Sequence, residues 1–122
     1  MTLDEIIANA SEGPLTRATV ESFCVASGIS FAAFCDEFSR VVATGYFHGR
    51  LDFSFCDGAI NNLYGFMMTE MTEAPFPAYA YSVFLAFDEG EYHHRKDPPN
   101  ASPEELYTKP MIAEIISNAT NA

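Results

Sequence analysis

The apolar and polar positions along the chain follow a helical period almost throughout. Apolar residues recur three and four positions apart, and they do so most regularly at Phe31, Phe34, Cys35, Phe38, Val41 and Val42. This spacing matches the α-helical period and places one apolar stripe on one face. Alternation of the kind that marks a strand occurs only in AYAYSV, residues 78–83, where helical spacing fits equally well. The pattern therefore predicts an all-α fold of five or six helices.

Local start and stop signals place most of the helix boundaries. Thr2 and Glu5 form a capping-box sequence, Ser30 is a typical N-cap residue, and Gly28 suits the end of a helix. We expect helices at about 2–10, 15–27, 30–44, 54–71, 75–88 and a final short one after Pro110, which should interrupt the segment that begins near 102. Gly45 should end the third helix, and residues 46–53 should form a turn or an aromatic-anchored loop.

The segment 75–88 is predicted to be the central helix of a single domain that spans residues 1–122. From 74 to 87 it carries no charged side chain, and apolar residues lie on all of its sides. Such a helix requires neighbours on most sides, because exposed aromatic groups on this scale would be adhesive. It is shorter than the roughly 20 apolar residues needed to cross a membrane. We expect Val83, Phe84 and Phe87 to be buried in it.

Cysteine content and the N-terminal residues indicate a cytoplasmic protein. The three cysteines, Cys24, Cys35 and Cys56, are odd in number, lie in apolar periodic segments and form no CxxC pair. Buried, reduced thiols explain this arrangement best. The first ten residues contain Asp4 and Glu5 but no basic residue, so they do not have the composition of a signal peptide.

The strongest compositional signal is negative charge. The chain has 17 acidic and 6 basic residues, a net charge of −11, and no lysine or arginine between Arg50 and Arg95. This charge repels phosphate backbones and anionic membranes and attracts basic partners. The helix pair around Gly28 could be a helix-turn-helix, but its second helix offers Asp36 and Glu37 against a single Arg40. We therefore expect neither nucleic acid nor membrane as a partner.

One cluster has side chains that can bind a metal, namely Asp88, Glu89, Glu91, His93 and His94, of which Glu91, His93 and His94 are the strongest candidates. Glu91 and His94 have the i,i+3 spacing that di-iron bundles use. Such sites need a second Glu-x-x-His motif, and the remaining histidine, His48, has Gly45 in the glutamate position. We predict no metal, no cofactor and no catalytic residue. A small helical metal-binding protein or enzyme that uses this cluster is the alternative, and a helical adaptor module is a third reading.

The candidate partner-binding residues lie near the two ends of the central helix. Phe66, surrounded by polar and acidic neighbours, could be an interface anchor within an acidic rim, or it could simply contact a further helix. The full candidate set is Phe66, Glu70, Glu73, Asp88, Glu89, Glu91 and Tyr92.

The stretch FDEGEYHHRKDPPNASPEELYTKPMI, residues 87–112, carries a family resemblance. Asp88, Gly90, Glu91 and Tyr92, then a proline-bearing polar loop, then YTKP at 107–110, make it similar to the C-terminal part of small bacterial immunity proteins. These are encoded beside polymorphic toxins, including those of contact-dependent growth inhibition. The resemblance covers about a quarter of the chain. It implies a non-catalytic cytosolic protein that binds one cognate toxin domain, often a basic nuclease, and it transfers no contact residues.

Overall fold

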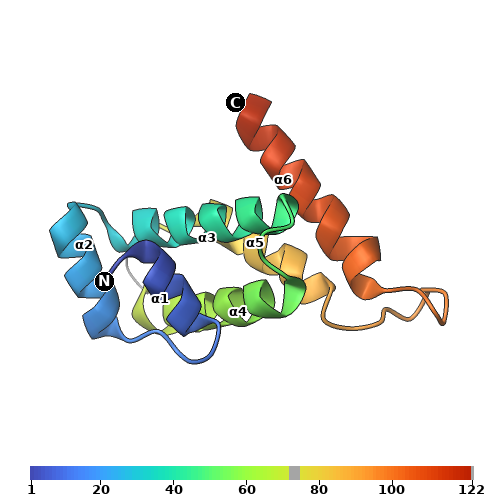
Figure 1. Ribbon diagram of the computed structural model, residues 1–122, viewed down its shortest axis with the longest axis horizontal. Helices are drawn as coiled ribbons and strands as arrows, with labels where there is room; N and C mark the ends of the chain where they lie inside the picture. The colour runs from blue at the N-terminus through green and yellow to red at the C-terminus, as the bar shows by residue number, and fades with distance from the viewer. Residues whose placement is uncertain (72–74, 122) are drawn as a thin grey trace.

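The computed structural model describes residues 1–71 and 75–121, which form six α-helices and one π-helical turn without a strand (Figure 1). The elements are α1 (Leu3–Ala10), α2 (Arg17–Ser27), α3 (Phe31–Phe47), α4 (Phe53–Glu70), α5 (Ala78–Glu89), the π-helical turn η1 (Glu104–Thr108) and α6 (Lys109–Asn121). The helices pack into one domain, so the predicted all-α architecture is confirmed.

Side-chain caps begin the first helices as the sequence indicates. The Thr2 hydroxyl accepts from the Glu5 amide while the Glu5 carboxylate accepts from the Thr2 amide, and Ser30 caps α3 through the amide of Ala33. Gly28 ends α2 in the left-handed conformation, with a φ of 69°. The helix expected from about residue 54 begins at Phe53, because Asp52 is the residue whose carboxylate accepts from the Phe55 amide.

The helix that Gly45 was expected to end continues to Phe47. Gly45 is buried inside α3, and a Cβ atom there would lie 2.6 Å from Leu51 Cδ1. The glycine therefore admits the Leu51 side chain against the helix and does not mark its end. The expected loop over 46–53 is correspondingly shorter, since only residues 48–52 separate α3 from α4.

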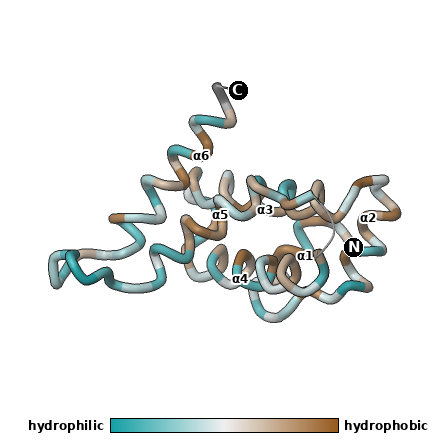
Figure 2. The backbone as a smooth tube through the Cα atoms, turned by 180° about the vertical axis from the view of Figure 1, so that it is seen from behind, coloured by the Kyte–Doolittle hydropathy of each residue, from teal (hydrophilic) through white to brown (hydrophobic). Residues whose placement is uncertain are grey.

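Pro110 was expected to interrupt the last helix, but the chain passes through it. The amide of Lys109 bonds to the carbonyl of Glu104, five residues earlier, so the backbone widens into a π-helical turn immediately before the proline. A wider turn moves the preceding carbonyls away from the proline ring and lets α6 follow directly. Figure 2 shows the hydrophilic loop that leads from α5 into this C-terminal segment.

The helix α5 has the central position that the sequence predicts. It contacts α3, α4, η1 and α6, and it buries Ala80, Val83, Ala86 and Phe87. Its bounds are shifted, because Pro77 is the N-cap residue and the helix begins at Ala78. Phe84, expected to be buried, is only half-buried, since it lies on the side of α5 that faces partly to solvent.

Each end of α5 depends on residues far away in the sequence. Pro77 supplies no side-chain cap, so the Asp36 carboxylate on α3 accepts from the Ala80 amide at 3.0 Å. At the other end, Thr108 Oγ1 donates to the Ala86 carbonyl at 2.8 Å. A side chain at Gly90 would clash with that hydroxyl, so the glycine permits the C-terminal segment to dock.

We expect Phe87→Ala to lower the free energy of unfolding by about 3–5 kcal/mol, because it empties a fully packed site. Phe87 is 1% exposed, and its ring lies 5.2 Å from that of Tyr46 and 5.9 Å from that of Phe53. The half-buried Phe84→Ala should cost clearly less. Urea denaturation measures both, with the exposed Phe47→Ala as the control. Equal losses at Phe84 and Phe87 would contradict the central placement of α5.

We expect Asp36→Ala to destabilise the fold by about 1 kcal/mol, because the Ala80 amide loses the acceptor that caps α5. Asp36→Asn keeps an acceptor oxygen at the same place and should cost less than half as much. The same denaturation assay compares the two variants. If alanine and asparagine are equally tolerated, the cap supplied by α3 does not contribute to stability.

Candidate functional site

Three carboxyl groups meet where the start of α4 lies beside the end of α5. Asp57 comes from α4, Asp88 from α5 and Glu91 from the turn that follows, and we call them the acidic cluster. Asn61, one turn along α4 from Asp57, donates to Glu91 Oε2 at 2.6 Å and to the Asp57 carbonyl at 2.9 Å. The cluster is therefore held by the packing of two helices and by one amide bridge.

The acidic cluster is electrostatically strained. Burial, together with the neighbouring Glu91 and Asp88 carboxyl groups, raises the pKa of Asp57 to about 8. Burial, with Glu91 and Glu89 nearby, also raises the pKa of Asp88. Asp57 Oδ1 is buried and has no hydrogen-bond donor, and a hydrogen bond between the Asp57 and Glu91 carboxyl groups requires a proton on one of the two. Among the ion pairs of the described residues, none joins a basic side chain to this cluster.

The predicted acids divide into different environments. Asp88 and Glu91 join the acidic cluster, whereas Glu89 Oε2 lies 3.0 Å from His94 Nε2. Glu70 forms an ion pair with Arg17 at 2.8 Å, so its charge is compensated within the chain. Glu73 lies outside the described residues. The acids were expected to surround both ends of the central helix; of those that the structure describes, the ones without a basic partner lie at the C-terminal end of α5.

The prediction that Phe66 is an exposed interface anchor is wrong. It is only 3% exposed, and its ring packs 5.6 Å from that of Phe31 on α3. The other reading of this residue, contact with a further helix, is the one that the structure bears out. Tyr92, by contrast, is 49% exposed and stacks on His94 with ring centroids 4.4 Å apart.

Sequence reasoning missed the parts of the site that α4 contributes. The predicted partner-binding residues include neither Asp57 nor Asn61. A usable signal was present, because residues 57, 61, 64 and 68 lie four, three and four positions apart and therefore share one face of α4. The contact of that face with Glu91 comes from tertiary packing.

The side chains of Glu91, His93 and His94, the candidate metal ligands, do not converge on one point. His94 lies between the rings of Tyr92 and Tyr107, and its Nε2 donates to the Glu89 carbonyl at 3.0 Å. His93 Nε2 donates to the Pro98 carbonyl at 2.7 Å, and Glu91 faces the acidic cluster. Within the described ranges, no group of three His, Cys, Asp or Glu side chains could hold a metal ion. These contacts order the loop after α5 and do not form a ligand set.

The cysteine side chains are poorly suited to nucleophilic chemistry. Cys24, Cys35 and Cys56 are free and buried. Burial raises the pKa of Cys35 and that of Cys56 to about 12, so the reactive thiolate is scarce at neutral pH.

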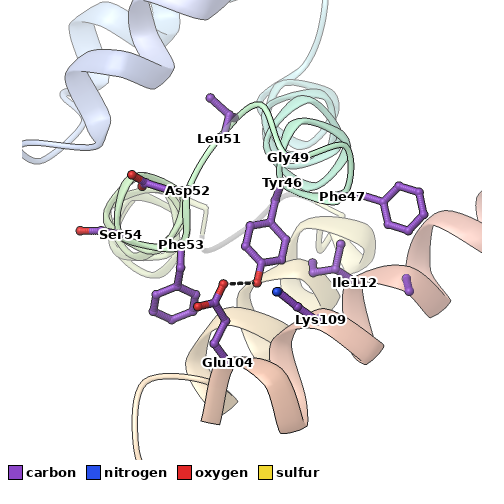
Figure 3. Close-up of a pocket in the computed structure, with 11 residues that line it drawn as sticks. Tyr46, Phe47, Gly49, Leu51, Asp52, Phe53, Ser54, Glu104, Lys109 and Ile112 are labelled. Carbon is purple, nitrogen blue, oxygen red and sulfur yellow. Dashed lines mark hydrogen bonds between the residues drawn. The ribbon is translucent and has the colours of Figure 1, made fainter. Parts of the chain in front are cut away.

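A second candidate is a pocket of about 880 Å³ between the α3–α4 turn and the C-terminal helix (Figure 3). Its lining residues are Tyr46, Phe47, Gly49, Leu51, Asp52, Phe53, Ser54, Glu104, Lys109, Ile112 and Ala113. The Tyr46 hydroxyl donates to Glu104 at 2.5 Å, and Lys109 pairs with Glu105 at 2.6 Å. The volume suits a small molecule, but these polar groups already bond within the chain.

Comparisons with models of protein families, with curated proteins and with solved structures find no match to this chain. Among the described residues, no single helix is long and apolar enough to cross a membrane, although α2 and α3, with a bend of 95° between them, have the length and composition as a pair.

We expect the protein to lose stability as the pH rises from about 5 to 8.5. The folded-state pKa of Asp57 is raised, so folding favours its protonated form, and this stabilisation disappears above the folded pKa of about 8. Asp57→Asn should flatten the dependence and stabilise the protein at pH 8.5 by about 1–2 kcal/mol, a value discounted for solvent screening.

Thermal or urea unfolding at several pH values measures this effect. Glu114→Gln, which removes one exposed charge on α6, is the control and should leave the pH profile unchanged. An Asp57→Asn profile parallel to that of the original protein would show that Asp57 is an ordinary surface acid.

Proposed function

We propose that this protein is an immunity-type inhibitor that binds a basic, nuclease-like toxin domain in the cytoplasm and neutralises it by masking a positively charged surface. The observation that carries the proposal is the uncompensated acidic cluster of Asp57, Asp88 and Glu91 where α4 packs against α5. Two of these acids, Asp88 and Glu91, lie in the stretch 87–112 that carries the family resemblance, although the resemblance itself assigns no contact residues.

Electrostatic energy favours binding of a cationic partner to the acidic cluster. Burying these carboxyl groups beside one another raises the free energy of their charged forms, and the pKa of Asp57 is raised by burial first and by Glu91 and Asp88 second. Lysine or arginine side chains of a partner would relieve this repulsion, so the cost carried by the free protein becomes a gain on binding. A surface that only had to be soluble would not need its acids packed beside one another.

The charge distribution over the remaining surface supports fast capture. Three basic side chains, Arg17, Arg40 and Lys109, are paired with acids of this chain and offer little repulsion to a basic partner. A net charge of −11 accelerates encounter with such a partner by electrostatic steering. Speed matters for an inhibitor because a toxin must be captured before it acts.

The alternatives receive less support from the contacts. Glu91, His93 and His94 each have separate partners, which disfavours a metal-binding protein or enzyme built on them. A helical adaptor module would use the same acidic surface without a toxin. Toxicity of the partner therefore separates the inhibitor from the adaptor.

The test begins with capture of the partner on the tagged protein and its identification by mass spectrometry. The partner is then expressed alone and together with this chain. We expect a protein with a basic domain that arrests growth alone and is harmless when co-expressed. A captured partner that is not toxic would contradict the inhibitor proposal.

We expect the combined variant Asp57→Asn, Asp88→Asn, Glu91→Gln to associate with the basic partner about tenfold more slowly at low salt, because steering charge is lost while shape is nearly kept. The difference should shrink as salt rises. Surface plasmon resonance at several salt concentrations gives both rate constants, and dissociation should change less than association.

The control variant removes three acids elsewhere, by Glu21→Gln, Glu37→Gln and Glu114→Gln, and both variants are measured above pH 8, where Asp57 is ionised and each variant removes three charges. These residues lie on α2, α3 and α6, away from the acidic cluster. An equal slowing by both variants would assign the effect to net charge alone. An association rate constant that changes neither with salt concentration nor in either variant would contradict the proposed role of the acidic cluster.

A further inference from the structure

An aromatic ladder lines the outer side of the α4–α5 pair beside the acidic cluster. Tyr64 on α4 stacks on Phe84 of α5, with centroids 3.8 Å apart and ring planes 6° apart. Tyr81 lies 6.3 Å from Tyr64 and 6.2 Å from Phe84, and Phe76 continues the row at 5.3 Å from Tyr81. We call these four residues the aromatic ladder.

The aromatic ladder faces partly to solvent. Phe76 is 54% exposed, and Met68, one turn beyond Tyr64 on the same face, is 46% exposed. Tyr64, Tyr81 and Phe84 are half-buried, in contrast to the fully enclosed Phe87 on the inner side of α5. Stacked rings at a partly exposed seam form an apolar surface of the kind that protein interfaces use as anchors.

The aromatic ladder and the acidic cluster form one continuous strip. The pairs Asn61–Glu91 and Tyr64–Phe84 show that α4 and α5 run antiparallel, since residue numbers rise along one helix as they fall along the other. Asn61 is one turn from Tyr64, and Asp88 is one turn from Phe84. The carboxyl groups therefore follow directly on the rings along the seam.

We propose that this strip is the docking surface for a basic protein partner, whose arginine side chains stack on the aromatic ladder and pair with the acidic cluster. The inference rests on the proposed function and names the chemistry of its interface. Arginine suits the strip better than lysine, because its planar guanidinium both stacks on rings and bonds to carboxylates in a bidentate manner.

The chain already contains this combination of contacts in another place. The Arg17 guanidinium lies 5.3 Å from the centroid of the Phe31 ring and at the same time pairs with Glu70. The strip offers the same two components, rings and carboxylates, and in the described parts of the chain no arginine pairs with its acids or lies over its rings. The pocket lined by Tyr46 and Glu104 offers less, since its hydroxyl and carboxylate bond to each other.

Two synthetic peptides of equal charge, deca-arginine and deca-lysine, test the proposal on the intact protein. NMR titration follows the ring signals of the aromatic ladder, and calorimetry gives the affinities. We expect the arginine peptide to bind about fivefold more tightly and to shift the signals of Tyr64, Tyr81 and Phe84. Failure of both peptides to bind, or equal affinity for the two, would overturn the proposal.

The variant Tyr64→Leu, Tyr81→Leu removes two rings but keeps apolar bulk, and circular dichroism verifies that it folds. We expect its preference for arginine to fall below about twofold, because the stacking contribution is lost. Phe47→Leu, at the rim of the pocket, is the matched control and should keep the full preference. Loss of the preference in Phe47→Leu alone would move the docking surface to the pocket and overturn the inference.

Failures of the two proposals have different signatures. If arginine preference maps to the aromatic ladder but the captured partner is not toxic, the docking surface stands and the inhibitor proposal fails. Suppose instead that a toxin is neutralised and that its affinity depends on the acidic cluster but is unchanged in the Tyr64→Leu, Tyr81→Leu variant. The inhibitor proposal then stands, and the inference of an aromatic docking surface is overturned.

Discussion

The structure depends on the need to enclose α5, a helix that is apolar on nearly every side and has no side-chain cap of its own. Asp36 on α3 supplies the missing acceptor at its N-terminus, and Thr108 binds the Ala86 carbonyl near its C-terminus. Since these partners come from both halves of the chain, the folding of α5 ties the N-terminal and C-terminal helices into one domain.

The same enclosure determines where charge and aromatic surface gather. The inner side of α5 is sealed by α3 and by the rings around Phe87, so Tyr81 and Phe84 remain on the outer side beside α4. The first polar residues after the apolar run then emerge beside Asp57. A packing requirement thus places carboxylates and stacked rings along one seam, and the proposed function uses what this seam presents.

Features that depend on local spacing could be predicted from the sequence, whereas those that depend on a distant partner could not. The caps at Thr2 and Ser30 and the central place of α5 follow from neighbouring residues. The buried Gly45 needed knowledge of where Leu51 packs, and Phe66 needed knowledge of Phe31. For the candidate site, the absence of basic residues between 50 and 95 predicted an acidic surface, but not which acids meet.

The electrostatic cost that burial and repulsion impose on the acidic cluster should fall when a cationic partner binds. The most direct test is carboxyl ¹³C NMR titration of Asp57, in the free protein and in the presence of deca-arginine. The account predicts a pKa near 8 in the free protein, where burial and Glu91 disfavour the charge, and a clear fall when the peptide is bound. An ordinary pKa near 4 in the free protein, or a raised value that the peptide leaves unchanged, would contradict it.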